Sequence, residues 1–211
     1  MSQLFVLTER PSVYLASKSP RRQELLRQIG VEFEELLLRE AAGRRRDMVE
    51  SPRKDEAPLE YVKRVARTKA SVAWHQMSHR GLPPRPILAA DTEVILDNHV
   101  LGKPKDAAHA ALMLEQLSDR THEVHTAVAV RWNAQIMLAV SSSRVTFRAL
   151  TREEIQRYIA TGEPFDKAGA YAVQGRAAVF ISRLEGSYSG VMGLPLHETA
   201  EILGKVGFYV L

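Results

Sequence analysis

The segment from Val13 to Gly30 constrains the fold most, because it has the pattern of a strand, a short turn and a helix in direct succession. An apolar run, Val13–Ala16, is followed by a polar turn, and apolar residues then recur at helical spacing until Gly30. Ser19 is a favourable N-cap, Pro20 suits the first helical position, and glycine commonly ends a helix. The sequence therefore predicts a strand that leads directly into a helix.

The rest of the chain alternates between the same two patterns. Strand-like stretches are Val31–Leu38, Ile87 through Glu93, Val124–Val130, Ile136–Phe147 and Ala177–Leu184. Helix-like stretches begin at Pro58, after Asp106, after the capping box at Thr151, and at Pro195, the last ending near Gly204. Asp97–His99 predicts a turn, and Arg39–Ala57 a polar, basic loop. Interleaved helices and strands without repeats favour an α/β or α+β fold, which we expect to form one domain over residues 1–211, with two lobes around a cleft.

The composition excludes several classes of protein. The 211 residues include no cysteine, which rules out disulfides, thiol nucleophiles and cysteine-bound zinc. The apolar runs are too short for a membrane helix, and the first twelve residues make a poor signal peptide, so we expect a cytoplasmic protein without membrane contact. The net charge of +4 suits an anionic ligand, but it does not distinguish a nucleotide from a nucleic acid. The basic residues are scattered, which makes nucleic-acid binding a poor hypothesis.

The turn before the first helix is a candidate anion site. A helix N-terminus presents free N–H groups and the positive end of a dipole, and here Ser17, Ser19, Arg21 and Arg22 add donors. A capped helix with two solvated arginines fits the same residues about equally well. The phosphate-binding loop with its Gly-x-x-x-x-Gly-Lys pattern is absent from the sequence.

Asp91 is a second candidate, because it directly follows the apolar run that begins at Ile87. Ligand sites of α/β sheets often lie at the carboxyl end of a strand, where a carboxylate can bind a hard cation or act as a base. A turn-capping aspartate is an equally plausible interpretation from the sequence.

Three lysines and one glutamine complete the candidates. Lys69 lies on the apolar stripe of its predicted helix, where a solvated lysine is not expected. Lys103 and Lys167 lie in short loops beside glycine or proline, although each alone is more typical of a surface lysine. The segment from Gly162 to Gly175 is rich in turn formers and includes Gln174, whose amide can pair with the edge of a base.

Taken together, these motifs resemble the Maf family of nucleoside triphosphate pyrophosphatases. The matching blocks are Leu15–Arg22 with Glu24–Leu26, Tyr61–Val62 through Lys69–Ala70, Ala90–Thr92 with Gly102–Pro104, Gly162–Pro164 through Gln174–Gly175, Gly186–Tyr188, and Gly193–Leu196. They follow one another in order along nearly the whole chain. The resemblance implies a mixed α/β fold of two lobes, with a central twisted sheet, flanking helices and a deep cleft.

The resemblance also implies roles for individual residues. Asp91 would accept a proton, with Lys69 and Lys103 near the triphosphate and Glu50 as a further acidic residue. Ser17, Arg21, Arg22, Thr92, Lys167 and Gln174 would bind substrate. Asp91 and Glu50 would hold a divalent cation, Mg²⁺ or Mn²⁺. Arginine at 21, threonine at 92 and glutamine at 174 resemble the branch that prefers dTTP and UTP over 7-methyl-GTP.

The resemblance therefore implies an enzyme that hydrolyses dTTP and UTP to the monophosphate and pyrophosphate, a house-cleaning activity, and a homodimer. The alternative is a nucleotide-binding regulator of cell division that uses the same cleft without significant turnover.

Overall fold

The computed structural model describes residues 12–37 and 51–210. Its centre is a seven-stranded sheet in the order β2-β1-β3-β5-β6-β7, with β4 paired to the far end of β3. The strands are β1 (Ser12–Leu15), β2 (Glu32–Glu35), β3 (Ile87–Leu96), β4 (His99–Val100), β5 (Thr121–Trp132), β6 (Gln135–Phe147) and β7 (Ile181–Glu185). β1 is parallel to β2 and β3, and the remaining pairs are antiparallel. The prediction of a mixed α/β fold is confirmed.

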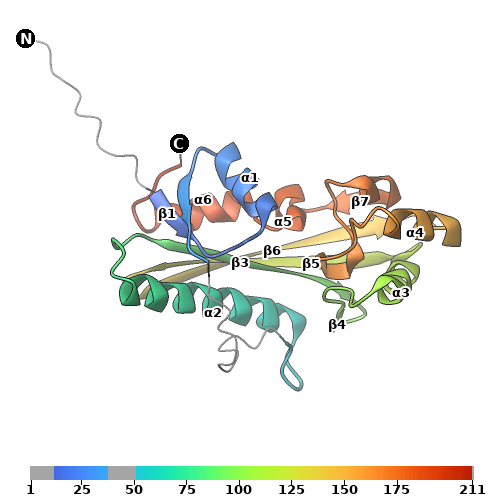
Figure 1. Ribbon diagram of the computed structural model, residues 1–211, viewed down its shortest axis with the longest axis horizontal. Coiled ribbons are helices and arrows are strands. Elements are labelled where there is room, and N and C mark those ends of the chain that lie inside the picture. The colour runs from blue at the N-terminus through green and yellow to red at the C-terminus, as the bar shows by residue number, and fades with distance from the viewer. Residues whose placement is uncertain (1–11, 38–50, 211) are drawn as a thin grey trace, which may run out of the picture.

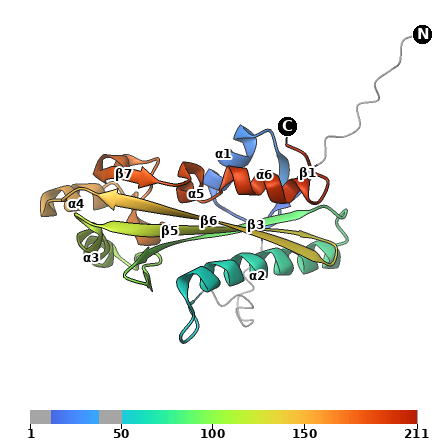
Figure 2. The same ribbon diagram turned by 180° about the vertical axis from the view of Figure 1, so that it is seen from behind.

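Helices cover both faces of the sheet. The α-helices are α1 (Pro20–Gln28), α2 (Pro58–His79), α3 (Ala107–Leu117), α4 (Arg152–Ile159), α5 (Tyr188–Met192) and α6 (Leu196–Gly204), and the 3₁₀ helices are η1 (Ala168–Ala170) and η2 (Arg176–Phe180). Figure 1 shows α2 along one face, with α1, α5 and α6 on the other face, and the same layers are seen from behind in Figure 2. Helices α3 and α4 lie with β7 at the opposite end of the sheet (Figure 1).

Three buried clusters fill the spaces between these layers. One lies between α2 and the sheet and includes Ile87 and Ala89, while a second lies between the sheet and α1 and α6 and includes Leu88 and Ala90. Alternate residues of β3 thus face opposite layers, as the pleat of a strand requires. The third cluster lies at the far end and joins α3, α4, η1 and η2 to Val94 and its neighbours. The two ends of the sheet therefore have separate cores. The deep cleft that we expected between them stays a prediction.

Several local predictions that rest on capping and turn signals are confirmed. The Asp106 carboxylate accepts from the His109 N–H at 2.7 Å, and Thr151 and Glu154 form a reciprocal capping box. The positive φ angles of Asp97 and Asn98, 49° and 63°, give the tight turn between β3 and β4. These contacts are local in the sequence, and so the residue types at a few neighbouring positions predict them.

One local prediction is confirmed only in part, and another is wrong. Ser19 is the N-cap residue of α1, as expected, but its side chain makes no capping hydrogen bond. The predicted strand Ala177–Leu184 begins instead as the 3₁₀ helix η2, and only Ile181–Glu185 forms a strand. The reason is a long-range contact, because the Glu163 carboxylate accepts from the backbone N–H groups at the start of η2.

Within the described residues, the helices are all too short or too polar to span a bilayer.

Candidate active site at the open edge of β3

The turn between β1 and α1 is built around Arg22. Its Nε donates to the Gly193 carbonyl at 2.8 Å, its Nη1 to Ser17 Oγ at 3.2 Å, and its Nη2 to Thr92 Oγ1 at 3.3 Å. Ser17 Oγ also accepts from the Ser19 N–H at 3.2 Å. The predicted alternative of two solvated arginines is therefore wrong for Arg22, which is fixed by acceptors from three separate segments.

Beside this turn, part of β3 has no neighbouring strand on one side among the described residues. Its pairing with β1 ends at Leu15 and Leu88, and its pairing with β4 starts only at Ile95. Residues 89–93 therefore form an open edge of β3, without a partner strand on that side among the described residues. Asp91 lies in the middle of β3, which corrects the prediction that it directly follows a strand. The open edge begins where β1 ends, which is where parallel sheets commonly bind ligands.

Asp91 is buried on the α2 face of β3. Its Oδ1 accepts from Lys69 Nζ at 2.7 Å, and the two side chains are 9% and 16% exposed. This ion pair explains why a lysine lies on the apolar stripe of α2. The other carboxylate oxygen, Oδ2, is buried and has no hydrogen-bond partner among the described residues. Burying such an oxygen without a partner costs free energy, so this atom is suited to a ligand.

The side chains of Arg21 and Lys103 lie close enough to that of Lys167 to repel its charge. The Gly169 N–H donates to the Gly102 carbonyl at 2.8 Å, which joins the loop that carries Lys103 to the one that carries Lys167. Burial lowers the pKa of Lys167, and the charges of Arg21 and Lys103 lower it further, while Asp166 and Glu163 oppose the shift.

Arg21 has the same kind of environment. Burial lowers the pKa of its guanidinium, and only Asp166 acts in the opposite direction. Like charges held in one neighbourhood disfavour one another, and a bound polyanion would remove that repulsion. We refer to Arg21, Lys103 and Lys167 as the cation cluster.

The turn-rich segment after Gly162 is organised by Glu163. Its carboxylate accepts from Tyr158 Oη and from the Arg176 N–H, each at 3.0 Å. A Cβ atom at Gly175 would lie 2.3 Å from Glu163 Oε1, so a side chain there would displace this carboxylate from its hydrogen bonds. This contact fixes the backbone next to Gln174, whose side chain is exposed.

A comparison with known families matches the model described as "Maf-like protein" to residues 12–206. The chain belongs to the Maf-like family.

Relatives of this Maf-like chain are similar over almost their whole length. A protein of Nitrosomonas europaea named dTTP/UTP pyrophosphatase is 51% identical over 94% of this chain and 96% of its own. The proteins of that name from Nitrosospira multiformis and Cupriavidus metallidurans are 54% and 52% identical, over 90% and 93% of this chain and 92% and 98% of their own.

The structure brings most of the predicted site residues of this Maf-like protein into three groups. Hydrogen bonds join Ser17, Arg22 and Thr92, an ion pair joins Lys69 and Asp91, and the cation cluster holds Arg21, Lys103 and Lys167. Gln174 lies beside the Glu163 contact. Glu50 lies outside the described residues.

Sequence reasoning gave no individual role to several residues that hold these groups in place. They are Glu163, Thr126, Gly190 and Gly193. Glu163 and Gly193 carried a signal, because both lie in blocks that match the family, and the φ angle of 119° at Gly193 explains the glycine there. Thr126 carried none, since it falls within a regular alternating strand.

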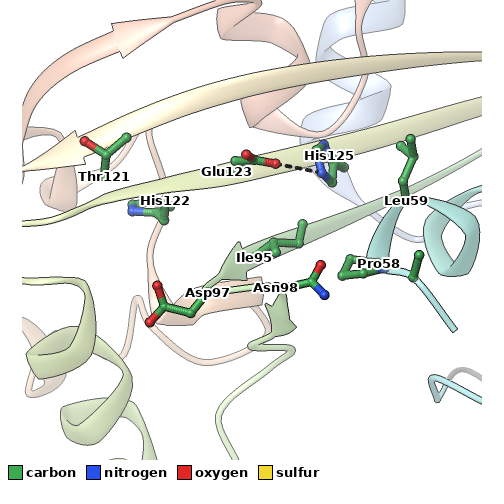
Figure 3. A pocket seen from close by; sticks show the side chains of 10 residues that line it. Pro58, Leu59, Ile95, Asp97, Asn98, Thr121, His122, Glu123 and His125 are labelled. Carbon is green, nitrogen blue, oxygen red and sulfur yellow. Dashed lines mark ion pairs between the residues drawn. The ribbon is translucent and has the colours of Figure 1, made fainter. Parts of the chain in front are cut away.

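A separate pocket of about 350 Å³ lies at the N-terminus of α2 (Figure 3). Its lining residues are Ala57, Pro58, Leu59, Ile95, Asp97, Asn98, Thr121, His122, Glu123 and His125. Figure 3 shows Glu123 paired with His125, at 3.1 Å between Oε2 and Nε2. The pocket includes none of the predicted site residues, and the carboxylates of Asp97 and Glu123 make it unsuitable for a polyanion.

Proposed function

We propose that this Maf-like protein hydrolyses dTTP and UTP to the nucleoside monophosphate and pyrophosphate. The names of its relatives support this reaction. The observation that carries the proposal is the Asp91–Lys69 pair at the open edge of β3, with Arg22 on one side and the cation cluster beyond it. A polyanion that contacts all of these groups would lie along the open edge.

The charges of the site suit a triphosphate. A nucleoside triphosphate has about four negative charges near neutral pH, and their burial without compensation would be prohibitive. Arg22 has the planar donor geometry that matches phosphate oxygens, and the cation cluster adds three more positive charges. The N-terminus of α1 adds backbone donors beside Arg21 and Arg22.

Asp91 is proposed as the group that accepts a proton from the attacking water. The water would attack the α-phosphorus, and pyrophosphate would leave. Lys69 holds Oδ1 of this carboxylate, which leaves the buried Oδ2 to act in one of two ways. It would take the proton directly, or it would bind the cation that holds the attacking water.

A divalent cation, Mg²⁺ or Mn²⁺, is proposed as the cofactor. The unpartnered Oδ2 of Asp91 fits such an ion, because hard cations prefer carboxylate oxygens. Asp91 would hold the ion together with Glu50, the partner that the sequence predicts. The cation would polarise a phosphoryl oxygen and compensate charge on the leaving pyrophosphate.

Base choice is assigned to Arg21 and Gln174. Gln174 presents both a donor and an acceptor to the edge of a base, and the Glu163–Gly175 contact fixes the adjacent backbone. Assembly as a homodimer and a cytoplasmic location remain predictions from the sequence.

The experiment is a substrate panel with the purified protein. It includes dTTP, UTP, dCTP, CTP, GTP and 7-methyl-GTP, with Mg²⁺ or Mn²⁺, and pyrophosphate is measured through a coupled inorganic pyrophosphatase. We expect release above the blank, fastest with dTTP or UTP. Release that is absent with every nucleotide would favour the alternative, a regulator that binds nucleotide without turnover.

The variant Asp91→Asn tests the role of the carboxylate. We expect kcat to fall by about 10²-fold or more with a smaller change in KM, because loss of a positioned proton acceptor costs about that much. The matched control is Asp97→Asn, which removes an exposed carboxylate that pairs with Arg120. Near-normal turnover by Asp91→Asn would remove Asp91 from the mechanism.

A further inference from the structure

Thr126 and Thr92 lie directly opposite each other on β5 and β3. Thr126 is fully buried, and its Oγ1 lies 2.7 Å from the Gly190 carbonyl oxygen and 2.9 Å from Thr92 Oγ1. The Thr126 hydroxyl is directed at both of these oxygen atoms, and Thr92 Oγ1 also accepts from Arg22 Nη2 at 3.3 Å. Thr126 therefore links the hydroxyl that contacts Arg22 to the carbonyl group of Gly190.

Helix α5 and the residue that follows it hold Arg22 in two ways, one indirect and one direct. The Gly190 carbonyl ends the chain of hydroxyls, and the Gly193 carbonyl accepts directly from Arg22 Nε at 2.8 Å. Neither glycine tolerates a side chain easily. A Cβ at Gly190 would lie 3.0 Å from Ser141 Oγ, and Gly193 has a φ angle of +119°. The glycines of this segment therefore allow two carbonyl groups to approach the site.

We propose that Thr126 is a positioning residue that fixes the Arg22 guanidinium through Thr92. We call Ser17, Thr92, Thr126, Gly190 and Gly193 the Arg22 clamp. The clamp rests on the proposed function and extends it. It makes a threonine of β5 responsible for the orientation of an arginine that binds the anion.

The clamp gives Thr92 an indirect role in substrate binding. Its Oγ1 accepts from both Thr126 and Arg22, so it contributes by holding Arg22.

The test compares three variants. Thr126→Val removes the hydroxyl at nearly constant volume, while Thr126→Ser keeps the hydroxyl and removes a methyl group. The matched control is Thr199→Val on α6, since Thr199 is equally buried and its hydroxyl has no partner among the described residues. The readouts are the Kd of inorganic pyrophosphate by calorimetry, kcat and KM for dTTP, and the Tm.

We expect Thr126→Val to raise the pyrophosphate Kd and the KM for dTTP about tenfold, and to change kcat less. A loss of this size is typical when a charged hydrogen-bond donor loses its fixed acceptor. Thr126→Ser and Thr199→Val are expected to stay within about twofold of the wild type. Thr92→Val and Thr126→Val combined should cost less than the product of their separate effects, since both break one chain.

Each other outcome has a distinct meaning. Wild-type values for Thr126→Val overturn the clamp, and so does an equal loss in Thr126→Ser, which would indicate packing of the methyl group. If Thr126→Val does not fold, Thr92→Val against Thr92→Ser makes the same comparison from the other side of the bond. A wild type that binds pyrophosphate but hydrolyses no nucleotide contradicts the proposed function alone, because the Kd comparison still tests the clamp. A wild type that does not bind pyrophosphate overturns both.

Discussion

Arg21 and Arg22 are adjacent in the sequence, yet their guanidinium groups have opposite kinds of surroundings. Arg22 donates three hydrogen bonds to neutral oxygen atoms of the protein. Arg21 belongs to a cluster of like charges, in which burial lowers its pKa and the pKa of Lys167. The guanidinium of Arg22 is thus held in position before a ligand binds. The cation cluster, by contrast, gains a favourable partner only when an anion binds.

The largest expected effect of this difference concerns arginine-to-lysine changes. Arg22→Lys should lower kcat/KM for dTTP by about 50-fold, because a lysine cannot reproduce the fork that engages three acceptors. Arg21→Lys should lower it less than tenfold, since the cluster mainly supplies charge. Steady-state kinetics on both variants measures the contrast, and equal losses would mean that the two arginines do not differ in the way proposed.

A smaller effect concerns the pH dependence of anion binding. Because the pKa of Lys167 is lowered in the free protein and a bound polyanion favours the ammonium, binding takes up protons. The affinity for pyrophosphate should therefore fall as pH rises through the lowered pKa. Calorimetry on wild type and Lys167→Met at matched pH cancels the titration of pyrophosphate itself.

The variant Lys167→Met should have a flatter dependence than the wild type. Lys105→Met, which removes an exposed lysine near Lys103, is the control and should keep the wild-type slope. Parallel curves for wild type and Lys167→Met would show that this lysine does not titrate on binding.

The smallest expected effect is on stability without ligand. Lys167→Met removes a repelling, partly buried charge, so the Tm of the free protein should rise by about 1 °C, as a change of a few tenths of a kcal/mol would give. The increase in Tm on adding pyrophosphate should be smaller than in the wild type. Differential scanning calorimetry measures both, and a lower Tm for the free variant would contradict the repulsion.

Local signals in the sequence predicted much of the fold. The caps at Asp106 and Thr151 and the turn at Asp97 depend on residues within three or four positions, and the structure confirms them. Lys69 shows what such local signals can and cannot predict about the site. Its place on an apolar stripe indicated a buried partner, but only the structure identifies that partner as Asp91.

The contacts that sequence reasoning missed join residues far apart in the chain. Thr126 lies 34 positions from Thr92 and 64 from Gly190, and nothing in its own neighbourhood distinguishes it from other buried strand residues. The wrong strand at Ala177 has the same origin, because Glu163 stabilises a helical turn there from 14 positions away. Strand pairing and loop packing create these contacts, and periodicity carries no information about them.

The long strands at the centre have a mechanical consequence. β5 and β6, of 12 and 13 residues, are paired along their whole lengths, and they contribute to the cores at both ends of the sheet. A rotation of one end of the sheet relative to the other would have to bend the paired strands β5 and β6, because no flexible linker separates the two ends in the described part of the chain. The torsional stiffness of the two strands thus keeps the ends in a fixed relation, and adjustment to nucleotides of different shape falls to side chains and loops along the open edge.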